Sequence, residues 1–276
     1  MVLLNIGFSS AQENKLDDKL LRKYLSSTDT IYFKDFVITI DTVKIYETTH
    51  RTSCYVFKKG KCIFSVPISS LRKKGCEIGL IPFIPGEDKK LFLHIYDDGM
   101  EYPCYWIIDL ANPDNPLYES TDYNSEHGRI VSVGDYDGDG YLEFAQAVSN
   151  FEWICDDVSH ASTPSTFAIF KYSVSQRKFI LANKQFSKLI LSDTLFTDQD
   201  MIDFMKNPVY AKNPRDDEYY LSNILSVFLN YTYGGQENKG WQFFNRWYGW
   251  SDKEKMKLEI KDRLKRSDIY NQLYQK

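Results

Sequence analysis

Short hydrophobic stretches alternate with polar turn residues from about residue 30 to residue 183. Each stretch is rich in β-branched or aromatic side chains, and Gly, Pro, Asp or Asn separate one stretch from the next. This pattern predicts an antiparallel β meander, arranged as a sandwich or as propeller-like sheets. The expected strands are Ile31–Phe33, Phe36–Ile40, Val43–Tyr46, Cys54–Phe57, Cys62–Val66, Leu91–Tyr96, Tyr105–Ile108, Arg129–Val133, Leu142–Val148, Phe167–Tyr172 and Lys178–Leu181.

One expected hairpin fixes its own register. Lys59-Gly60 separates two of the strands, and a two-residue turn there would set Phe57 opposite Cys62 and Cys54 opposite Ser65. Cys54 and Cys62 would therefore not pair with each other. The chain has five cysteines, an odd number without a CxxC spacing. We expect most of them to be buried as small hydrophobic side chains.

Beyond about residue 187 the hydrophobic period becomes helical. An acidic first turn predicts a helix at 198–205, and a stronger stripe predicts one at 216–231. Ser251 and Glu254 have the spacing of a capping box, which would open a helix that runs through Ile269. We therefore expect a β domain at residues 30–186 and an α-helical C-terminal region at 187–276.

The first residues resemble the end of an export signal. Ser9, Ser10 and Ala11 are small and follow an apolar stretch, as residues before a signal-peptidase cleavage site do. We interpret residues 1–11 as a signal-peptide remnant and residues 12–29 as a helix or linker. This interpretation predicts a bacterial protein exported to the periplasm or the cell exterior.

Composition excludes several classes of protein. The chain has 34 Lys plus Arg and 38 Asp plus Glu, a net charge of −4, which argues against a nucleic-acid partner. No apolar run has the length of a membrane-spanning helix. Hydrophobic residues make up 43% of the chain and aromatic residues 16%, so the sequence is not that of a disordered protein.

One passage carries a specific chemistry. Asp135, Asp137 and Asp139 stand at alternate positions and are followed by Gly140 and Tyr141. Three carboxylates in one tight loop supply the oxygen ligands that a hard cation needs, the glycine permits a sharp reversal, and Tyr141 offers its main-chain carbonyl. No nitrogen or sulfur ligand is nearby, so zinc and copper fit poorly. The loop predicts a Ca²⁺ site.

The spacing of the next acidic residue separates this loop from an EF-hand. If Asp135 is the first position, the twelfth is Gln146, where an EF-hand has its bidentate glutamate, and the acidic residue is Glu143 at the ninth position. The stretch 128–148, with strand-like flanks, resembles the calcium loop of FG-GAP repeats, known from integrin α-subunit propellers and secreted bacterial proteins. The resemblance implies the ligands Asp135, Asp137, Asp139, the carbonyl of Tyr141, and Glu143 in place of the usual aspartate. A propeller of that family repeats the loop, and this chain has one good copy.

The sequence also contains an aromatic cluster. Trp241, Trp247 and Trp250 lie within ten residues of one another. Helical spacing favours packing of these side chains in the core, whereas an exposed cluster would be a stacking platform for sugars or an interface anchor.

The predicted site favours a structural metal over a catalytic one, because ligands from a single loop leave little open coordination for a substrate. Our first hypothesis is an exported calcium-binding protein that acts by binding an unknown protein or glycan. The second is a hydrolase of glycans or peptides with a supporting calcium, and the third is an immunity- or inhibitor-like partner of another protein. The sequence leaves enzymatic activity open and identifies no catalytic residue and no oligomeric state.

Overall fold

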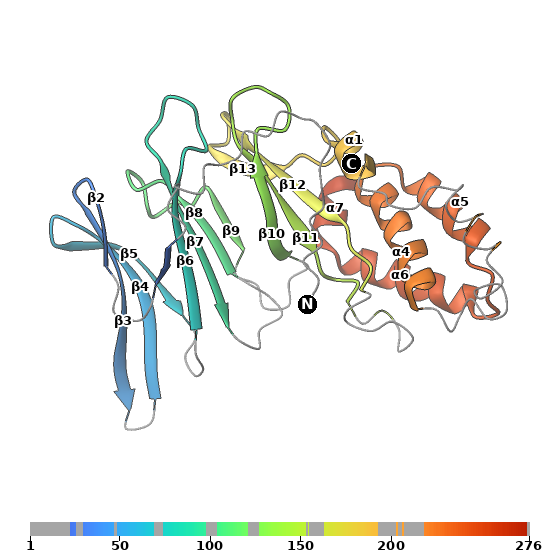
Figure 1. The fold of residues 1–276 in the computed structure, drawn as a ribbon, viewed down its shortest axis with the longest axis horizontal. Helices are drawn as coiled ribbons and strands as arrows, with labels where there is room; N and C mark the ends of the chain where they lie inside the picture. The colour runs from blue at the N-terminus through green and yellow to red at the C-terminus, as the bar shows by residue number, and fades with distance from the viewer. Residues whose placement is uncertain are drawn as a thin grey trace. The chain divides into compact units, whose positions relative to one another are not determined.

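The computed structural model describes residues 23–25, 30–46, 49–68, 74–97, 104–120, 127–152, 154, 163–192, 203, 206 and 218–274. Within these residues the chain forms three antiparallel sheets followed by a group of helices (Figure 1). The prediction of a mainly β protein with a helical C-terminal region is therefore confirmed. The interpreted signal remnant, most of the 12–29 segment and nearly all of the helix expected at 198–205 lie outside the described residues.

The first sheet is a meander of four strands in chain order. Its strands are β2 (Thr30–Phe33), β3 (Phe36–Tyr46), β4 (Thr49–Lys58) and β5 (Lys61–Ile68). β3 is one continuous strand where the sequence predicted two, because all but one of its residues from Phe36 to Tyr46 find partners on β4. The pairing with β4 continues through the polar residues Asp41 and Thr42, which therefore do not end the strand.

The second sheet has the order β1-β6-β7-β8-β9. Its strands are β1 (Lys23–Leu25), β6 (Lys74–Ile81), β7 (Lys90–Asp97), β8 (Cys104–Ile108) and β9 (Tyr118–Ser120). β6 and β9 were not predicted from the sequence, and Lys23–Leu25 was expected to be part of a helix or linker. Pairing explains each, because β6 aligns along β7, β9 along β8, and β1 along β6.

The third sheet has the order β10-β11-β12-β13. Its strands are β10 (His127–Gly134), β11 (Glu143–Val148), β12 (Phe167–Ser173) and β13 (Lys178–Leu181). All four coincide closely with predicted strands. The last strand ends at Leu181, and α1 (Ser187–Ser192) is the next element.

The chain divides into two compact units whose limits differ from the expected boundary between strands and helices. The first unit comprises Met1–Thr121, Val133–Glu143 and Tyr172–Lys178, and the second comprises Asp122–Ser132, Phe144–Lys171 and Phe179–Lys276. The loop that joins β10 to β11 thus belongs to the first unit. Most of the third sheet belongs with the helices.

The first unit has a hydrophobic core between its two sheets. Ile38, Cys54 and Val56 are fully buried and pack with Leu91 and Leu93 of β7. Along β3 and β4, Ile38 and Val56 alternate with half-buried residues, as in a sheet with one face in a core, whereas Leu91 and Leu93 lie in a run of buried residues at 90–93. Trp106 of β8 lies in the same cluster.

The Lys59-Gly60 hairpin has the predicted tip but a shifted register beyond it. Phe57 pairs with Cys62, as predicted, whereas Cys54 pairs with Val66 and not with Ser65. The difference of one residue comes from a β-bulge at Ile63, which has no partner on β4. The two cysteines do not pair with each other, as expected, and Cys54 is a free, buried thiol.

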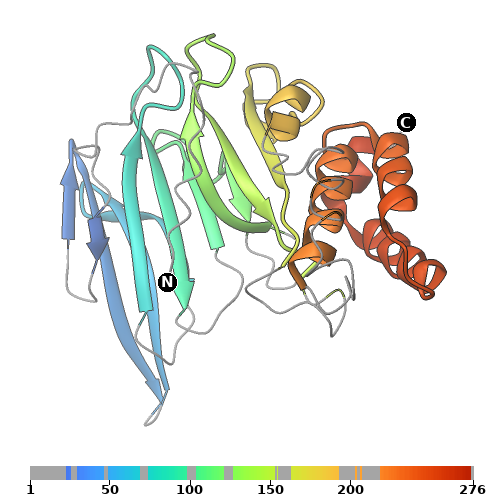
Figure 2. The ribbon, with the colours of Figure 1, turned by 45° about the vertical axis from the view of Figure 1, so that its right-hand side comes forward.

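The second unit contains the long helices, which Figure 2 shows as one group. Their bounds are α4 (Glu218–Tyr233), α5 (Glu237–Trp247), α6 (Lys253–Arg266) and α7 (Asp268–Tyr274). No helix among the described residues combines the length and hydrophobicity that crossing a membrane requires. Gly240 of α5 permits a close crossing with α4, because an added Cβ would lie 2.9 Å from the Phe228 carbonyl oxygen.

The C-terminal helix predicted through Ile269 is in fact two helices. α6 has Asp252 at its N-cap without a side-chain cap bond, so the expected capping box from Ser251 does not form. The break is at the buried Ser267, whose Oγ accepts the Tyr270 N–H at 2.8 Å and lies 3.0 Å from the Tyr233 hydroxyl. Ser267 therefore caps α7, and a side-chain cap of this kind competes with helix continuation.

Asn183 ties strands to helix inside the second unit. Its side chain is fully buried. Oδ1 accepts the Ile169 N–H at 2.6 Å, and Nδ2 donates to the carbonyl oxygens of Phe167 and Tyr233, each at 3.0 Å. One amide therefore satisfies three main-chain groups from β12 and the end of α4.

We expect Asn183→Ala to lower the free energy of unfolding by about 2–4 kcal/mol, because three buried main-chain groups lose their partner together. Urea denaturation followed by circular dichroism measures this loss. Asn271→Ala is the control, since the half-buried Asn271 side chain donates one bond, to the Lys265 carbonyl oxygen, and we expect a loss of at most about 1 kcal/mol. Equal losses in the two variants would contradict the central role of Asn183.

Burial raises the pKa of the Cys54 thiol from 9.0 to about 12. The folded state therefore favours the neutral thiol, and this contribution to stability is complete below pH 9 and is lost as the pH rises toward 12. Between pH 8 and pH 10, the wild-type protein should lose about 1.3 kcal/mol more stability than Cys54→Ala. Denaturant unfolding at the two pH values measures the difference. Cys62→Ala, at an exposed thiol, should keep the wild-type dependence, and an equally steep loss in Cys54→Ala would disprove the assignment.

Candidate metal centre

The acidic motif forms the tight turn between β10 and β11, within the first compact unit. The backbone reverses at two glycines with positive φ, Gly138 at 78° and Gly140 at 89°. Residues other than glycine rarely adopt these backbone angles, because their Cβ comes too close to the main chain. The glycine that the sequence predicted to allow the reversal, Gly140, is therefore one of two that do so.

The carboxylate of Asp135 organises this turn. Its Oδ1 accepts the N–H groups of Gly138 at 2.7 Å and Asp139 at 3.1 Å, and its Oδ2 accepts the Gly140 N–H at 3.0 Å. Three main-chain donors therefore surround one side chain. The turn is thus curled around the first carboxylate of the motif.

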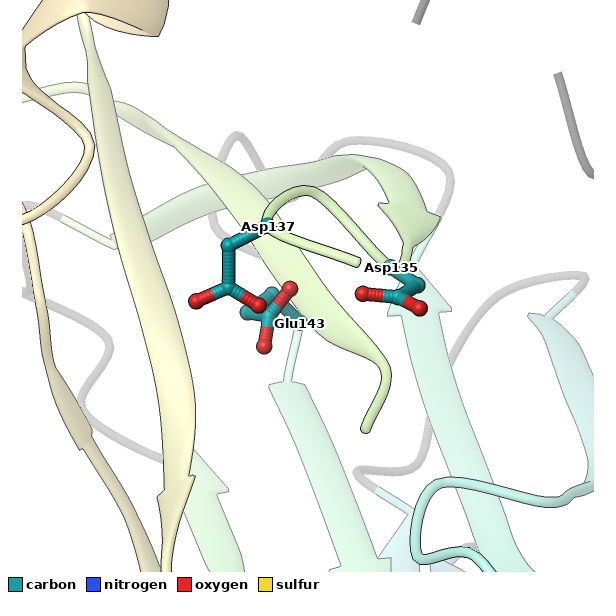
Figure 3. Close-up of side chains that lie close together, drawn as sticks. All are labelled: Asp135, Asp137 and Glu143. Carbon is teal, nitrogen blue, oxygen red and sulfur yellow. The ribbon is translucent and has the colours of Figure 1, made fainter. Parts of the chain in front are cut away.

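Asp135, Asp137 and Glu143 come together at this turn. Each offers one carboxylate oxygen, and the three oxygens lie within 4.8 Å of one another. Figure 3 shows the carboxylates of Asp137 and Glu143 side by side, with Asp135 facing them. Asp137 is exposed, Asp135 is half-buried and Glu143 is 0% exposed. The group therefore runs from solvent to the protein interior.

The buried member of the group is oriented by the turn itself. Glu143 Oε2 accepts the Tyr136 N–H at 2.8 Å. A carboxylate removed from water needs positive charge or hydrogen-bond donors to offset the lost solvation, and two further carboxylates nearby increase that need. A bound cation among the three would supply it.

Two other segments of the first unit hold the turn in place. The Leu142 N–H donates to the Phe83 carbonyl oxygen at 3.0 Å. The ring of Tyr141 stacks on Tyr172, with centroids 6.1 Å apart and planes 15° apart. These anchors were not predicted, because Phe83 and Tyr172 are distant in the sequence and neither belongs to a recognisable motif.

For two of the five expected ligands, Asp139 and the Tyr141 carbonyl, the structure provides no test of metal binding. Asp139 lies outside the group of three, and its Oδ1 accepts the Tyr141 N–H at 3.0 Å, which closes the end of the turn. The assignment of Asp139 and of the Tyr141 carbonyl as ligands therefore remains a prediction. Gln146, at the twelfth position, is fully buried in β11, where its Nε2 donates to the Gly128 carbonyl oxygen at 2.9 Å.

The three carboxylates fit a calcium ion in type and spacing. All the donor atoms are oxygens, which hard divalent cations prefer. Two oxygens bound to the same Ca²⁺ can be separated by up to twice the usual ligand distance, about 4.6–5.2 Å. The observed limit of 4.8 Å is therefore compatible with one shared ion.

The three tryptophans of the aromatic cluster are each half-buried and contact other aromatic rings. Trp241 lies 4.6 Å from Phe228 between ring centroids, Trp250 lies 5.6 Å from Tyr220, and Trp247 lies 6.4 Å from Phe243. The Trp241 indole also donates to Glu237 at 3.0 Å. These contacts are those of packing side chains, and a role of the cluster in binding stays a prediction.

Comparison with known proteins found no matching protein family, no matching curated protein and no matching solved structure. The resemblance to FG-GAP repeats rests on the motif residues alone.

We expect Gly140→Ala to lower the free energy of unfolding by about 1–2 kcal/mol, because alanine must adopt a φ of 89° there. Added bulk is not the cause, since the new Cβ would lie 3.8 Å from Pro85 Cγ, an ordinary contact. Denaturant titration measures the loss. Gly249→Ala is the control because its added Cβ would meet nothing within 4 Å. If both variants kept wild-type stability, the turn would not depend on its left-handed glycine.

Proposed function

We propose that this protein binds one calcium ion in the 135–143 turn and that the ion has a structural role in a protein that acts by binding a partner. The observation that carries the proposal is the convergence of Asp135, Asp137 and Glu143, whose oxygens lie within 4.8 Å although Glu143 is fully buried. Like charges at this spacing repel one another, and a divalent cation converts that repulsion into attraction.

The arrangement of the ligands supports a structural ion. All three carboxylates come from nine consecutive residues, and only Asp137 among them is exposed. A catalytic metal needs an open position for substrate and a nearby acid or base. The bound ion would instead lock the turn between β10 and β11 in the conformation that Gly138 and Gly140 allow.

Export fits a site of this kind. The group supplies three carboxylates, one of them exposed, and a small number of charged ligands weakens calcium binding. Modules outside the cell bind calcium with dissociation constants of about 10⁻⁴–10⁻³ M. We therefore propose a periplasmic or extracellular location, where such an affinity is sufficient.

We also propose that the three sheets are propeller-like blades. Each is a meander whose four consecutive strands are hydrogen-bonded neighbours, and β1 adds to the second on its β6 side. In the first unit, two such sheets pack face to face through the cluster around Ile38 and Leu93. Neighbouring propeller blades pack in this way, and the calcium turn would lie between the first two strands of the third blade.

Calcium should raise the melting temperature relative to the chelated protein. A ligand that binds only the folded state at about 100 times its dissociation constant adds about 2.7 kcal/mol, which corresponds to several degrees for a chain of this size. Differential scanning fluorimetry in about 10–100 mM CaCl₂, which is about 100 times the proposed dissociation constant, and in EDTA measures the shift. Mg²⁺ should give a smaller shift, because it requires a stricter octahedron.

Asp137→Asn should abolish the calcium shift and leave the fold intact, since Asp137 is exposed and not part of the core. Asp262→Asn removes the same charge from the exposed face of α6 and should keep the full shift. If calcium leaves the melting temperature of the wild-type protein unchanged at neutral pH, the proposal is wrong.

A further inference from the structure

The first unit contains a cavity of about 590 Å³ that is separate from the calcium turn. On one side it is lined by five consecutive residues of β5, Cys62 to Val66. On the other side it is lined by Trp106, Pro113, Asp114, Pro116 and Glu119. We call this cavity the β5 groove. None of its lining residues belongs to the candidate metal centre.

The β5 groove runs along a strand edge. β5 is the last strand in the order β2-β3-β4-β5, and in the described part of the chain it pairs with β4 alone. Successive side chains of a strand point to opposite faces, so consecutive residues can all line one cavity only where it follows the strand's edge. Five residues of strand span about 16 Å. The groove therefore offers main-chain donors and acceptors over the length of a short peptide.

Two features of β5 limit what can pair with this edge. Ile63 forms a bulge, and Pro67 lacks an N–H group. Bulges and prolines on an edge strand prevent continuous pairing with the edge of another sheet. The β5 edge is thus unsuited to a second copy of this sheet and suited to a short extended segment that gains the rest of its affinity from side-chain contacts.

The other contacts in the groove are apolar and acidic. Ile63 and Phe64 are half-buried, and Trp106, in the core of the unit, donates from its indole Nε1 to Glu119 Oε1 at 3.1 Å. Asp114 and Glu119 are exposed, and the lining includes no Lys, Arg or His. Two exposed carboxylates in a lining without a cation favour a positively charged side chain.

We propose that the β5 groove binds an extended segment of a partner protein in which a Lys or Arg alternates with apolar side chains. The main chain of the segment would pair with the outer edge of β5 between Ile63 and Pro67. Its cation would lie between Asp114 and Glu119, and a neighbouring apolar side chain would contact Phe64. This inference rests on the binding role proposed above and on no property of the calcium turn.

Cys62 provides a reporter inside the groove. Its thiol is exposed, whereas Cys54 and Cys104 are buried. The full-length protein is alkylated with iodoacetamide, and the rate at Cys62 is read by mass spectrometry with and without peptide. The probe is an eight-residue peptide of alternating valine and threonine with two lysines in place of threonines. Matched peptides carry glutamate in place of lysine, or N-methyl groups on alternate main-chain nitrogens.

We expect the lysine peptide to slow alkylation of Cys62 at least about fivefold at saturation and the other two peptides to leave the rate unchanged. Isothermal titration then gives the dissociation constant. Asp114→Asn with Glu119→Gln should weaken binding about threefold to tenfold, because each exposed ion pair contributes up to about 1 kcal/mol. The control, Glu254→Gln with Asp262→Asn, removes the same charge from α6 and should bind as the wild type does.

Three results would overturn the proposal: no protection of Cys62 by any peptide, equal protection by the lysine and glutamate peptides, or protection that depends on protein concentration alone. The last would assign the edge to a second copy of this chain. A normal calcium shift in the same preparation would show that the failure lies in the groove and not in the metal centre.

Discussion

The burial of the Glu143 carboxylate is the constraint on which the candidate site depends. A carboxylate that is 0% exposed must be oriented and neutralised, and the turn supplies the orientation through the Tyr136 N–H. Asp135 uses its own oxygens to fold the turn around itself, so the turn both creates the crowding of negative charge and holds the crowded oxygens in place. A divalent cation held by the three carboxylates would offset this crowding of negative charge.

The candidate metal centre could be predicted from the sequence because its residues are close together in the chain. Asp135, Asp137 and Glu143 lie within nine positions, so residue type and spacing were enough to identify them as neighbours. The support for the turn could not be predicted. The Phe83 carbonyl that accepts the Leu142 N–H is far away in the chain, and a main-chain acceptor leaves no trace in the residue type. The β5 groove was missed for the same reason, since Phe64 and Glu119 meet only through the fold.

The fold shows a similar division between local and non-local causes. Strands with β-branched or aromatic runs, such as β8 and β12, were predicted, and so was the amphipathic α4. β6 contains Gly75 and Gly79, whose low strand propensity hid a strand that eight pairs with β7 stabilise. The α6–α7 break has a different cause. Ser267 ends one helix and caps the next because its hydroxyl also meets Tyr233, a tertiary contact that helical periodicity does not contain.

The bulge at Ile63 explains the error in the predicted hairpin register and also limits what can pair with the edge of β5. The register of a tight hairpin can be predicted by counting residues outward from the turn. The predicted partner is right for Phe57 and wrong for Cys54, because β5 contains one extra residue between the two pairs. An extra residue in an edge strand disrupts the ladder and increases the local twist, and natural sheets use it to prevent uncontrolled edge pairing. Here the bulge and Pro67 leave a short stretch of edge between them, beside a wall that carries two carboxylates, Asp114 and Glu119. If β5 only had to avoid pairing with other strands, the bulge and the proline would be enough and the wall beside them would have no purpose. The combination therefore argues that β5 binds a selected partner.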